Sequence, residues 1–250
     1  MIPLAALLAT TAFLTGCAVP DANARRGDQE HHGHSSEITE PKAEIAPVLD
    51  IPLDPSAGRE IGLVFESYLS PQQEAGEEAD TPGITPDVFK STEPSTPREE
   101  RDSRGHGIVA FSRDFSRAYV QLAIENIDPD DIVMAHLHCG KPGQLGPIIV
   151  DFGSTGSLSE YFADGRLDYE LTNRDLERTI EGGEGIVGAF TAGCPIILAR
   201  PGDRIRTLSG MAVVAEEGEL YFNIHTKSQT FYGDIRGQLY PVAAPTPAQP

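Results

Sequence analysis

The sequence predicts an all-β fold, a sandwich or barrel of short antiparallel-type strands with one or two short helices. Segments in which apolar and polar residues alternate recur through the chain, and turns rich in glycine and proline separate them. Such spacing is typical of two packed sheets. Helix signals occur at only two places, and both are short.

The first strand is predicted at 60–69, where apolar residues alternate with others from Ile61 to Leu69. Residues 70–105 then break the pattern with five prolines among many acidic and hydroxyl residues. We expect this stretch to be a disordered surface insertion, although so long a structureless loop is unusual inside a compact domain.

Strand patterns return after the insertion. The predicted strands cover 108–111, 117–125, 132–139, 148–152, 219–226 and 233–240. Thr172 to Asp175 offers a cap for a short helix through Ile180. A second helix is predicted over 205–216, where the run 211–214 is equally compatible with a strand.

The N-terminus predicts export. Residues 2–14 form an uncharged apolar run, too short for a stable membrane span but suited to a signal peptide. The run ends in Leu14-Thr15-Gly16-Cys17, which resembles a bacterial lipobox, so residues 1–16 are expected to be removed and Cys17 to carry lipid. The alternative is an ordinary secretory signal with a chance cysteine. The lipid predicts a membrane anchor, on the cell membrane or the outer membrane, with the protein facing the periplasm or the exterior.

The two ends of the mature chain predict flexible segments. Residues 17–56 are polar and acidic and are predicted to be a disordered tether, and the tail 242–250 is rich in proline. His31, His32 and His34 could chelate a transition metal loosely, but a solvated tether is the simpler interpretation.

The net charge indicates which classes of partner the chain can bind. The formal net charge is −19, which opposes binding to nucleic acid and favours cations or basic surfaces.

The chain has three cysteines. If Cys17 is acylated, Cys139 and Cys194 remain as a pair, and an oxidising compartment would allow them to form a disulfide.

Four ordered segments carry a family resemblance. They are Ala135 to Gly140 (AHLHCG), Gly146 to Val150 (GPIIV), Tyr221 to Thr226 (YFNIHT) and Gly233 to Leu239 (GDIRGQL). Together they resemble the CHRD (chordin) domain family over residues 57–241. The resemblance implies a Greek-key β-sandwich, either immunoglobulin-like or Cu/Zn superoxide-dismutase-like, and implies little about activity.

Strand alternation assigns the residues of these segments to faces. The core side is predicted to hold Val133, Ala135, Leu137, Cys139, Leu220, Phe222 and Ile224. His136, His138 and His225 fall on the polar side, where three neutral imidazoles could bind Cu or Zn. The alternative is that these histidines hydrogen-bond to loop carbonyls and pin the edge of the sandwich.

The H-x-H step is similar to the copper-binding strand of Cu/Zn superoxide dismutases. A complete dismutase site is not expected, because neither the zinc-ligand spacing nor a bridging histidine is evident. Asn223 and Arg236 are further candidates for binding, although Arg236 could instead brace a neighbouring carboxylate.

The usual catalytic signatures for nucleophiles, phosphate binding and zinc proteases are absent. We therefore expect a binding or structural module of the cell envelope, without a catalytic activity or cofactor and with an envelope protein as a candidate partner. The alternative is a copper- or zinc-binding protein.

Overall fold

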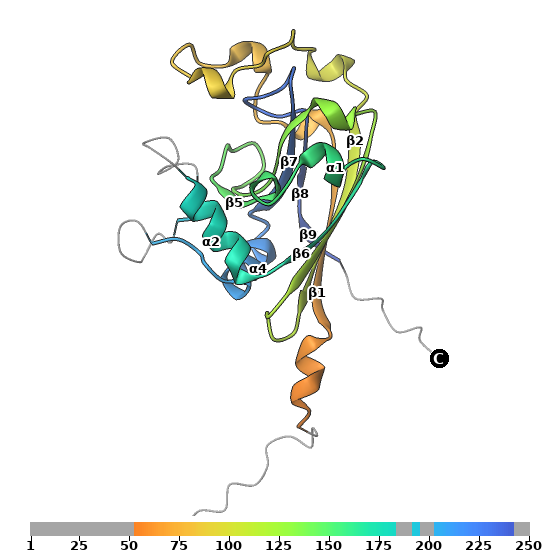
Figure 1. The fold of residues 1–250 in the computed structure, drawn as a ribbon, viewed down its shortest axis with the longest axis vertical. Helices are drawn as coiled ribbons and strands as arrows, with labels where there is room; N and C mark the ends of the chain where they lie inside the picture. The colour runs from red at the N-terminus through yellow and green to blue at the C-terminus, as the bar shows by residue number, and fades with distance from the viewer. Residues whose placement is uncertain (1–52, 184–191, 196–202, 243–250) are drawn as a thin grey trace, which may run out of the picture. The chain divides into compact units, whose positions relative to one another are not determined.

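The chain folds into two antiparallel sheets packed face to face, as the computed structural model shows for residues 53–183, 192–195 and 203–242 (Figure 1). The strands of this described part are β1 (Ile61–Leu69), β2 (Arg104–Ser112), β3 (Ala118–Glu125), β4 (Ile132–Cys139), β5 (Ile148–Asp151), β6 (Arg166–Leu171), β7 (Leu220–Thr226), β8 (Ile235–Gln238) and β9 (Tyr240–Pro241). The predicted all-β sandwich with short helices is confirmed.

One sheet has the strand order β6-β3-β2-β1-β9 and the other has the order β5-β4-β7-β8. Every paired strand runs antiparallel to its neighbour. In the second sheet β4 lies directly beside β7, although β4 ends at Cys139 and β7 begins only at Leu220. This pairing brings the HLH and NIH segments together.

The core lies between the two sheets. Phe65 and Phe111 meet edge to face, with ring centroids 5.9 Å apart, and both are almost fully buried. Gly107 of β2 allows close approach of the sheets, because a Cβ there would lie 2.6 Å from the ring of Phe222 in β7. Burial of alternate residues from both sheets is the main stabilising term for such a fold.

The helices are α1 (Leu158–Tyr161), α2 (Asn173–Gly182) and α4 (Leu208–Glu216). The predicted cap of α2 is present: the carboxylate of Asp175 accepts a hydrogen bond from the backbone N–H of Thr172 at 2.8 Å. The ambiguous run 211–214 is helical, because it lies inside α4, where Met211 and Ala212 are buried.

The segment between β1 and β2 differs from the expected disordered insertion. It contains four short 3-10 helices: η2 (Pro71–Gln73), η3 (Glu78–Asp80), η4 (Asp87–Phe89) and η5 (Arg98–Glu100). Glu78 orders it, since its buried carboxylate accepts hydrogen bonds from the backbone N–H groups of Phe231 and Tyr232 at 3.0–3.1 Å. Residues 70–103 therefore form a folded cover, which we call the β1–β2 cover.

Val133 is a second difference. It is 39% exposed, whereas Ile132 is buried. The register of β4 against β7 shifts between Ile132 and Met134, so a bulge turns Val133 away from the predicted core face. The other predicted core residues of β4 and β7 are buried.

Several sequence predictions lie outside the described residues. These are the signal peptide 1–16, the lipidated Cys17, the tether up to residue 52 with its three histidines, and the tail from residue 243. Among the residues that the structure does describe, no helix has the length and apolar character needed to cross a bilayer.

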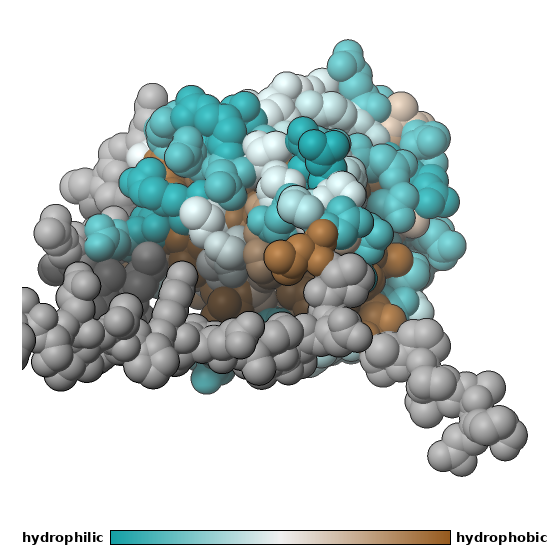
Figure 2. Space-filling model, turned by 90° about the horizontal axis from the view of Figure 1, so that it is seen from below, coloured by the Kyte–Doolittle hydropathy of each residue, from teal (hydrophilic) through white to brown (hydrophobic). Residues whose placement is uncertain are grey.

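The surface reflects the acidic, polar composition. Viewed from below relative to Figure 1, hydrophilic residues cover most of the visible described surface, with a compact hydrophobic cluster near the middle of this face (Figure 2).

Candidate metal centre

The pairing of β4 with β7 brings three histidines together on the outer face of the second sheet. His136 lies opposite Asn223 and His138 lies opposite Tyr221, while His225 pairs with Met134. The ring centroid of His136 is 5.2 Å from that of His138 and 5.3 Å from that of His225. The sequence prediction that the three side chains share one face is confirmed.

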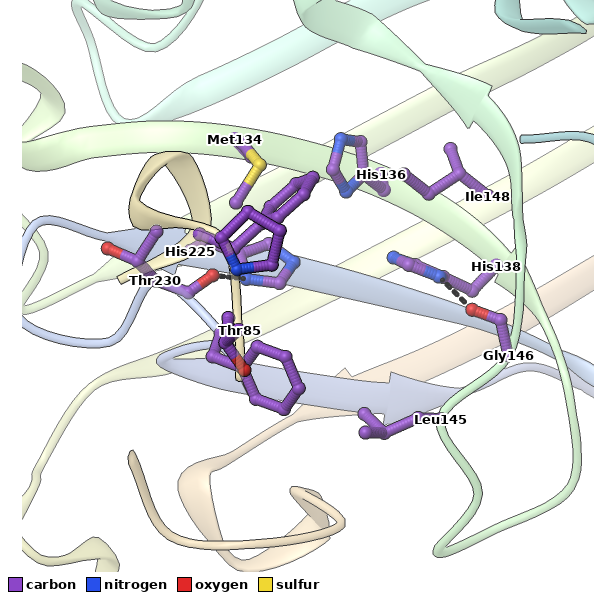
Figure 3. Close-up of a pocket in the computed structure, with 12 residues that line it drawn as sticks. Thr85, Met134, His136, His138, Leu145, Gly146, Ile148, His225 and Thr230 are labelled. Carbon is purple, nitrogen blue, oxygen red and sulfur yellow. Dashed lines mark hydrogen bonds between the residues drawn. The ribbon is translucent and has the colours of Figure 1, made fainter. Parts of the chain in front are cut away.

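The same histidines are buried, which the sequence did not indicate. Their exposed fractions are 3% for His136, 8% for His138 and 4% for His225. The β1–β2 cover and the loop between β4 and β5 lie over this face of the sheet, and the pocket that contains the histidines is lined by residues of both (Figure 3).

Two hydrogen bonds fix the protonation of two rings. Nδ1 of His138 lies 2.8 Å from the carbonyl oxygen of Gly146, and Nδ1 of His225 lies 3.0 Å from that of Thr230 (Figure 3). Because a carbonyl only accepts, each Nδ1 carries the proton, and each Nε2 is left with a free lone pair.

His136 lies beside a carboxylate. Its Nε2 lies 3.6 Å from Oδ1 of Asp151, the residue that pairs with it across β4 and β5. With the proton on that nitrogen, the lone pair of His136 is on Nδ1. A ligand histidine whose second nitrogen faces a carbonyl or carboxylate is the usual arrangement in metal sites.

Each of the three rings has one nitrogen without a hydrogen-bond partner among the described residues. Nδ1 of His136 and Nε2 of His138 and His225 are buried without a hydrogen-bond partner in the described residues. One nitrogen from each ring lies within 4.8 Å of the others. A triangle of that side has its centre about 2.8 Å from each corner, so shifts of less than about 1 Å would reach the 2.0–2.1 Å typical of metal–imidazole bonds.

Electrostatics keep the rings neutral. Burial lowers the pKa of His138 to about 3 and that of His225 to about 4. Burial, and then the neighbouring histidines, hold the pKa of His136 well below its ordinary value. Metal ions bind the neutral ring, so the site is in its ligand form over the physiological pH range.

The space beside the three rings is a cavity of about 220 Å³ with mainly apolar walls. The β1–β2 cover contributes Thr85, Pro86 and Phe89, and the loop between β4 and β5 contributes Leu145. Sequence reasoning missed these residues, because the cover has no periodic pattern to place it. Met134 of β4 also lines the cavity, and sequence reasoning does not assign it to the site.

Asn223 and Arg236 are buried beside this centre and hydrogen-bond within the chain. The amide of Asn223 donates to the carbonyl of Tyr232 at 2.8 Å. Arg236 donates to the carbonyls of Gln144 and Lys141 at 2.6 and 2.9 Å. It therefore braces the loop between β4 and β5 and not the expected carboxylate. That they bind a ligand stays a prediction.

Arg236 also connects to the histidines through Tyr221. Its guanidinium lies 3.5 Å from the centre of the Tyr221 ring, and this ring stacks on His138 at 4.9 Å. Tyr221 holds the same loop, since its hydroxyl accepts from the backbone N–H of Gly146 at 3.0 Å. The loop carbonyl that orients His138 is thus held from two sides.

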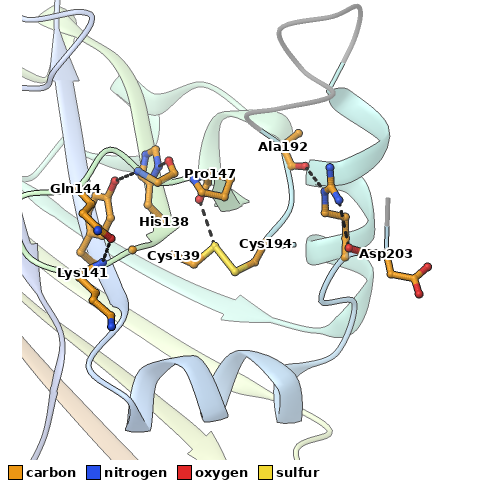
Figure 4. The surroundings of a disulfide bond; sticks show 12 residues. His138, Cys139, Lys141, Gln144, Pro147, Ala192, Cys194 and Asp203 are labelled. Carbon is orange, nitrogen blue, oxygen red and sulfur yellow. Dashed lines mark hydrogen bonds between the residues drawn. A yellow bond between two sulfur atoms is a disulfide. The ribbon is translucent and has the colours of Figure 1, made fainter. Parts of the chain in front are cut away.

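The predicted disulfide is present and adjoins the centre. Cys139, the residue after His138, is bonded to Cys194, with a Cα–Cα distance of 6.0 Å (Figure 4). The backbone N–H of Gly193 donates to the carbonyl of Ile148 in β5. The bond therefore joins residues 192–195 to the strands that carry the histidines.

Comparison with known proteins gives one match. A family model, the CHRD domain, matches residues 65–239. A search of curated proteins and a search of solved structures found no match. The choice between an immunoglobulin-like and a dismutase-like arrangement stays a prediction.

Proposed function

Because this chain belongs to the CHRD domain family, we propose that it is a binding module whose ligand is a copper or zinc ion held by His136, His138 and His225. The observation that carries the proposal is the set of three buried ring nitrogens, one on each histidine, that have no hydrogen-bond partners in the described residues.

An unpaired buried acceptor is costly. Leaving one polar atom without a partner costs about 1–3 kcal/mol, and the cluster contains three such atoms. A metal ion would satisfy all three together. Hydrogen bonds to loop carbonyls, the structural alternative, use the opposite nitrogens of His138 and His225 and leave these three without a role.

The test is a titration of the full chain with Cu(II) and with Zn(II). The matched control has His31, His32 and His34 replaced by alanine, so that only the buried centre can bind tightly. We expect one ion per chain in the control and at least a hundredfold weaker binding after His138→Gln, with thermal melts checking that the variant folds.

Two results would contradict the proposal. One is the absence of tight binding in the control. The other is undiminished binding in a folded His138→Gln variant, which would assign the ion elsewhere. A His106→Ala variant should bind as the parent does, because His106 contacts Glu66 on the other sheet.

We also propose that the module is exported and anchored through lipid on Cys17. The Cys139–Cys194 disulfide supports export, because such bonds persist in oxidising compartments. In a bacterial host, Cys17→Ser should move the protein from the membrane fraction to the soluble fraction. Mass spectrometry identifies the N-terminal peptide of the mature protein. If this peptide does not begin at an acylated Cys17, the proposed lipid anchor is wrong.

A further inference from the structure

Met134 lines the same pocket as the three histidines. It pairs directly with His225 across β4 and β7, and it precedes His136 by two residues on the same face of β4. Directly paired residues have Cβ atoms about 4.5–5.5 Å apart, which is within reach of a side chain with three rotatable bonds. Figure 3 shows Met134 next to His136 and His225 at the edge of the pocket that all of them line.

From this placement we infer that the centre is a copper site in which the thioether of Met134 joins the three histidines, and that it holds the reduced ion, Cu(I). The inference rests on the proposed metal-binding function and specifies its ligand set and its ion. Thioether sulfur is a soft ligand, and soft ligands select Cu(I) over Zn(II) and other harder cations.

The charge around the site favours a monovalent ion. The four proposed ligands are neutral, and the carboxylate of Asp151 lies beside the far nitrogen of His136, at 3.6 Å. A dication at the three nitrogens would have no anionic ligand among the described residues.

The surroundings add to this preference. The walls of the cavity are mainly apolar, and the penalty for placing an ion in such a medium grows steeply with its charge. Arg236 is buried, and its guanidinium lies 3.5 Å from the centre of the Tyr221 ring, which stacks on His138. The positive charge of this guanidinium opposes Cu(II) and Zn(II) more strongly than Cu(I).

The experiment compares the full chain lacking the three tether histidines with its Met134→Leu variant, which keeps the side-chain volume. Cu(I) is added with ascorbate under anaerobic conditions, so that the disulfide stays intact, and a chromogenic chelator competes for the ion. We expect Met134→Leu to weaken Cu(I) binding at least tenfold while changing Zn(II) and Cu(II) binding less than threefold. A tenfold loss of Cu(I) affinity with unchanged Cu(II) affinity lowers the one-electron reduction potential of the bound copper by about 59 mV.

X-ray absorption gives an independent readout. The parent loaded with Cu(I) should show a sulfur scatterer that the Met134→Leu variant lacks. Met211→Leu is the matched control, because Met211 is buried in the core and does not line the pocket. It should behave as the parent does in every assay.

The outcomes separate the two proposals. If the histidines bind metal but Met134→Leu leaves Cu(I) affinity and the sulfur scatterer unchanged, Met134 is not a ligand and the metal-binding function stands. Tighter binding of Zn(II) than of Cu(I) in the parent would overturn the choice of ion. If the parent binds no metal, both proposals fail.

Discussion

At the scale of single residues, the acidic side chain of Glu74 is buried and interacts electrostatically with Arg236 and Arg101. It is 4% exposed, and neither carboxylate oxygen has a hydrogen-bond partner in the described residues. Burial raises the pKa of Glu74 well above its ordinary value, although the positive charges of Arg236 and Arg101 oppose the shift. The folded protein therefore favours the protonated acid.

This shift predicts a pH-dependent loss of stability. A raised pKa in the folded state makes stability greatest below the unfolded pKa of about 4.5, and stability is lost as the pH rises from there through the folded value. Glu74→Gln removes the titration and keeps the shape. We expect the variant to gain thermal stability over the parent at pH 8 and to gain little at pH 4.

Differential scanning calorimetry at several pH values measures this difference. Glu100, an exposed residue of the same cover, provides the control substitution Glu100→Gln, which should not alter the pH profile. Equal melting temperatures of parent and Glu74→Gln across the whole range would show that the buried acid does not titrate as described.

The alternation of apolar and polar residues along β4 and β7 predicts the correct face for the three histidines. In β4 and β7 the apolar residues repeat with period two, and the side chains at 136, 138 and 225 fall opposite them. Val133 was misplaced because a bulge leaves no mark in a short strand pattern. Burial of the histidines depends on what lies over the sheet, and alternation within a strand carries no information about that.

At the scale of elements, the β1–β2 cover decides whether the centre is buried. Its contacts with the chain after β7 are polar: Ser91 Oγ accepts from the backbone N–H of Thr230, and Thr92 donates to the carbonyl of Lys227. Thr230 is the residue whose carbonyl orients His225. The cover therefore lines the cavity and also supports one of the three histidines.

Glu78 joins the cover to the chain after β7 through several hydrogen bonds, so Glu78→Ala tests its role. The change would leave the buried N–H groups of Phe231 and Tyr232 and the hydroxyl of Ser91 without their acceptor. We expect a loss of about 1–3 kcal/mol in the free energy of unfolding and faster proteolysis within 70–103, both measured against the parent. Glu100→Ala serves as control, and unchanged proteolysis in Glu78→Ala would show that the cover does not depend on this contact.

Element prediction succeeded where the signal was local. The cap at Thr172 to Asp175 uses residues three apart, and the structure has α2 at Asn173–Gly182. The order of the cover comes instead from contacts with residues about 150 positions later, such as Glu78 with Phe231. A sequence pattern read along the chain cannot show such contacts.

At the scale of the whole molecule, one covalent bond joins β4 to the segment that follows α2. Cys139 ends the strand that carries two of the histidines, and Cys194 lies 55 residues later. The cysteine count predicts this pairing if Cys17 carries lipid, although separation along the chain carries no information about distance in space. Closing a loop of this length restricts the unfolded chain and stabilises the fold by about 2–4 kcal/mol.

Removal of the Cys139–Cys194 disulfide should destabilise the fold. Cys194→Ala and Cys139→Ala should each lower the free energy of unfolding by about 2–4 kcal/mol, measured by chemical denaturation of oxidised protein. The double variant should lose no more than about 1 kcal/mol beyond either single variant, because all three lack the same bond. Treatment with a strong reductant should bring the parent close to the variants and leave the variants unchanged. If the single variants matched the oxidised parent, the bond would not stabilise the fold, and the β4–β5 loop would be held by contacts such as the hydrogen bonds of Arg236 and Tyr221.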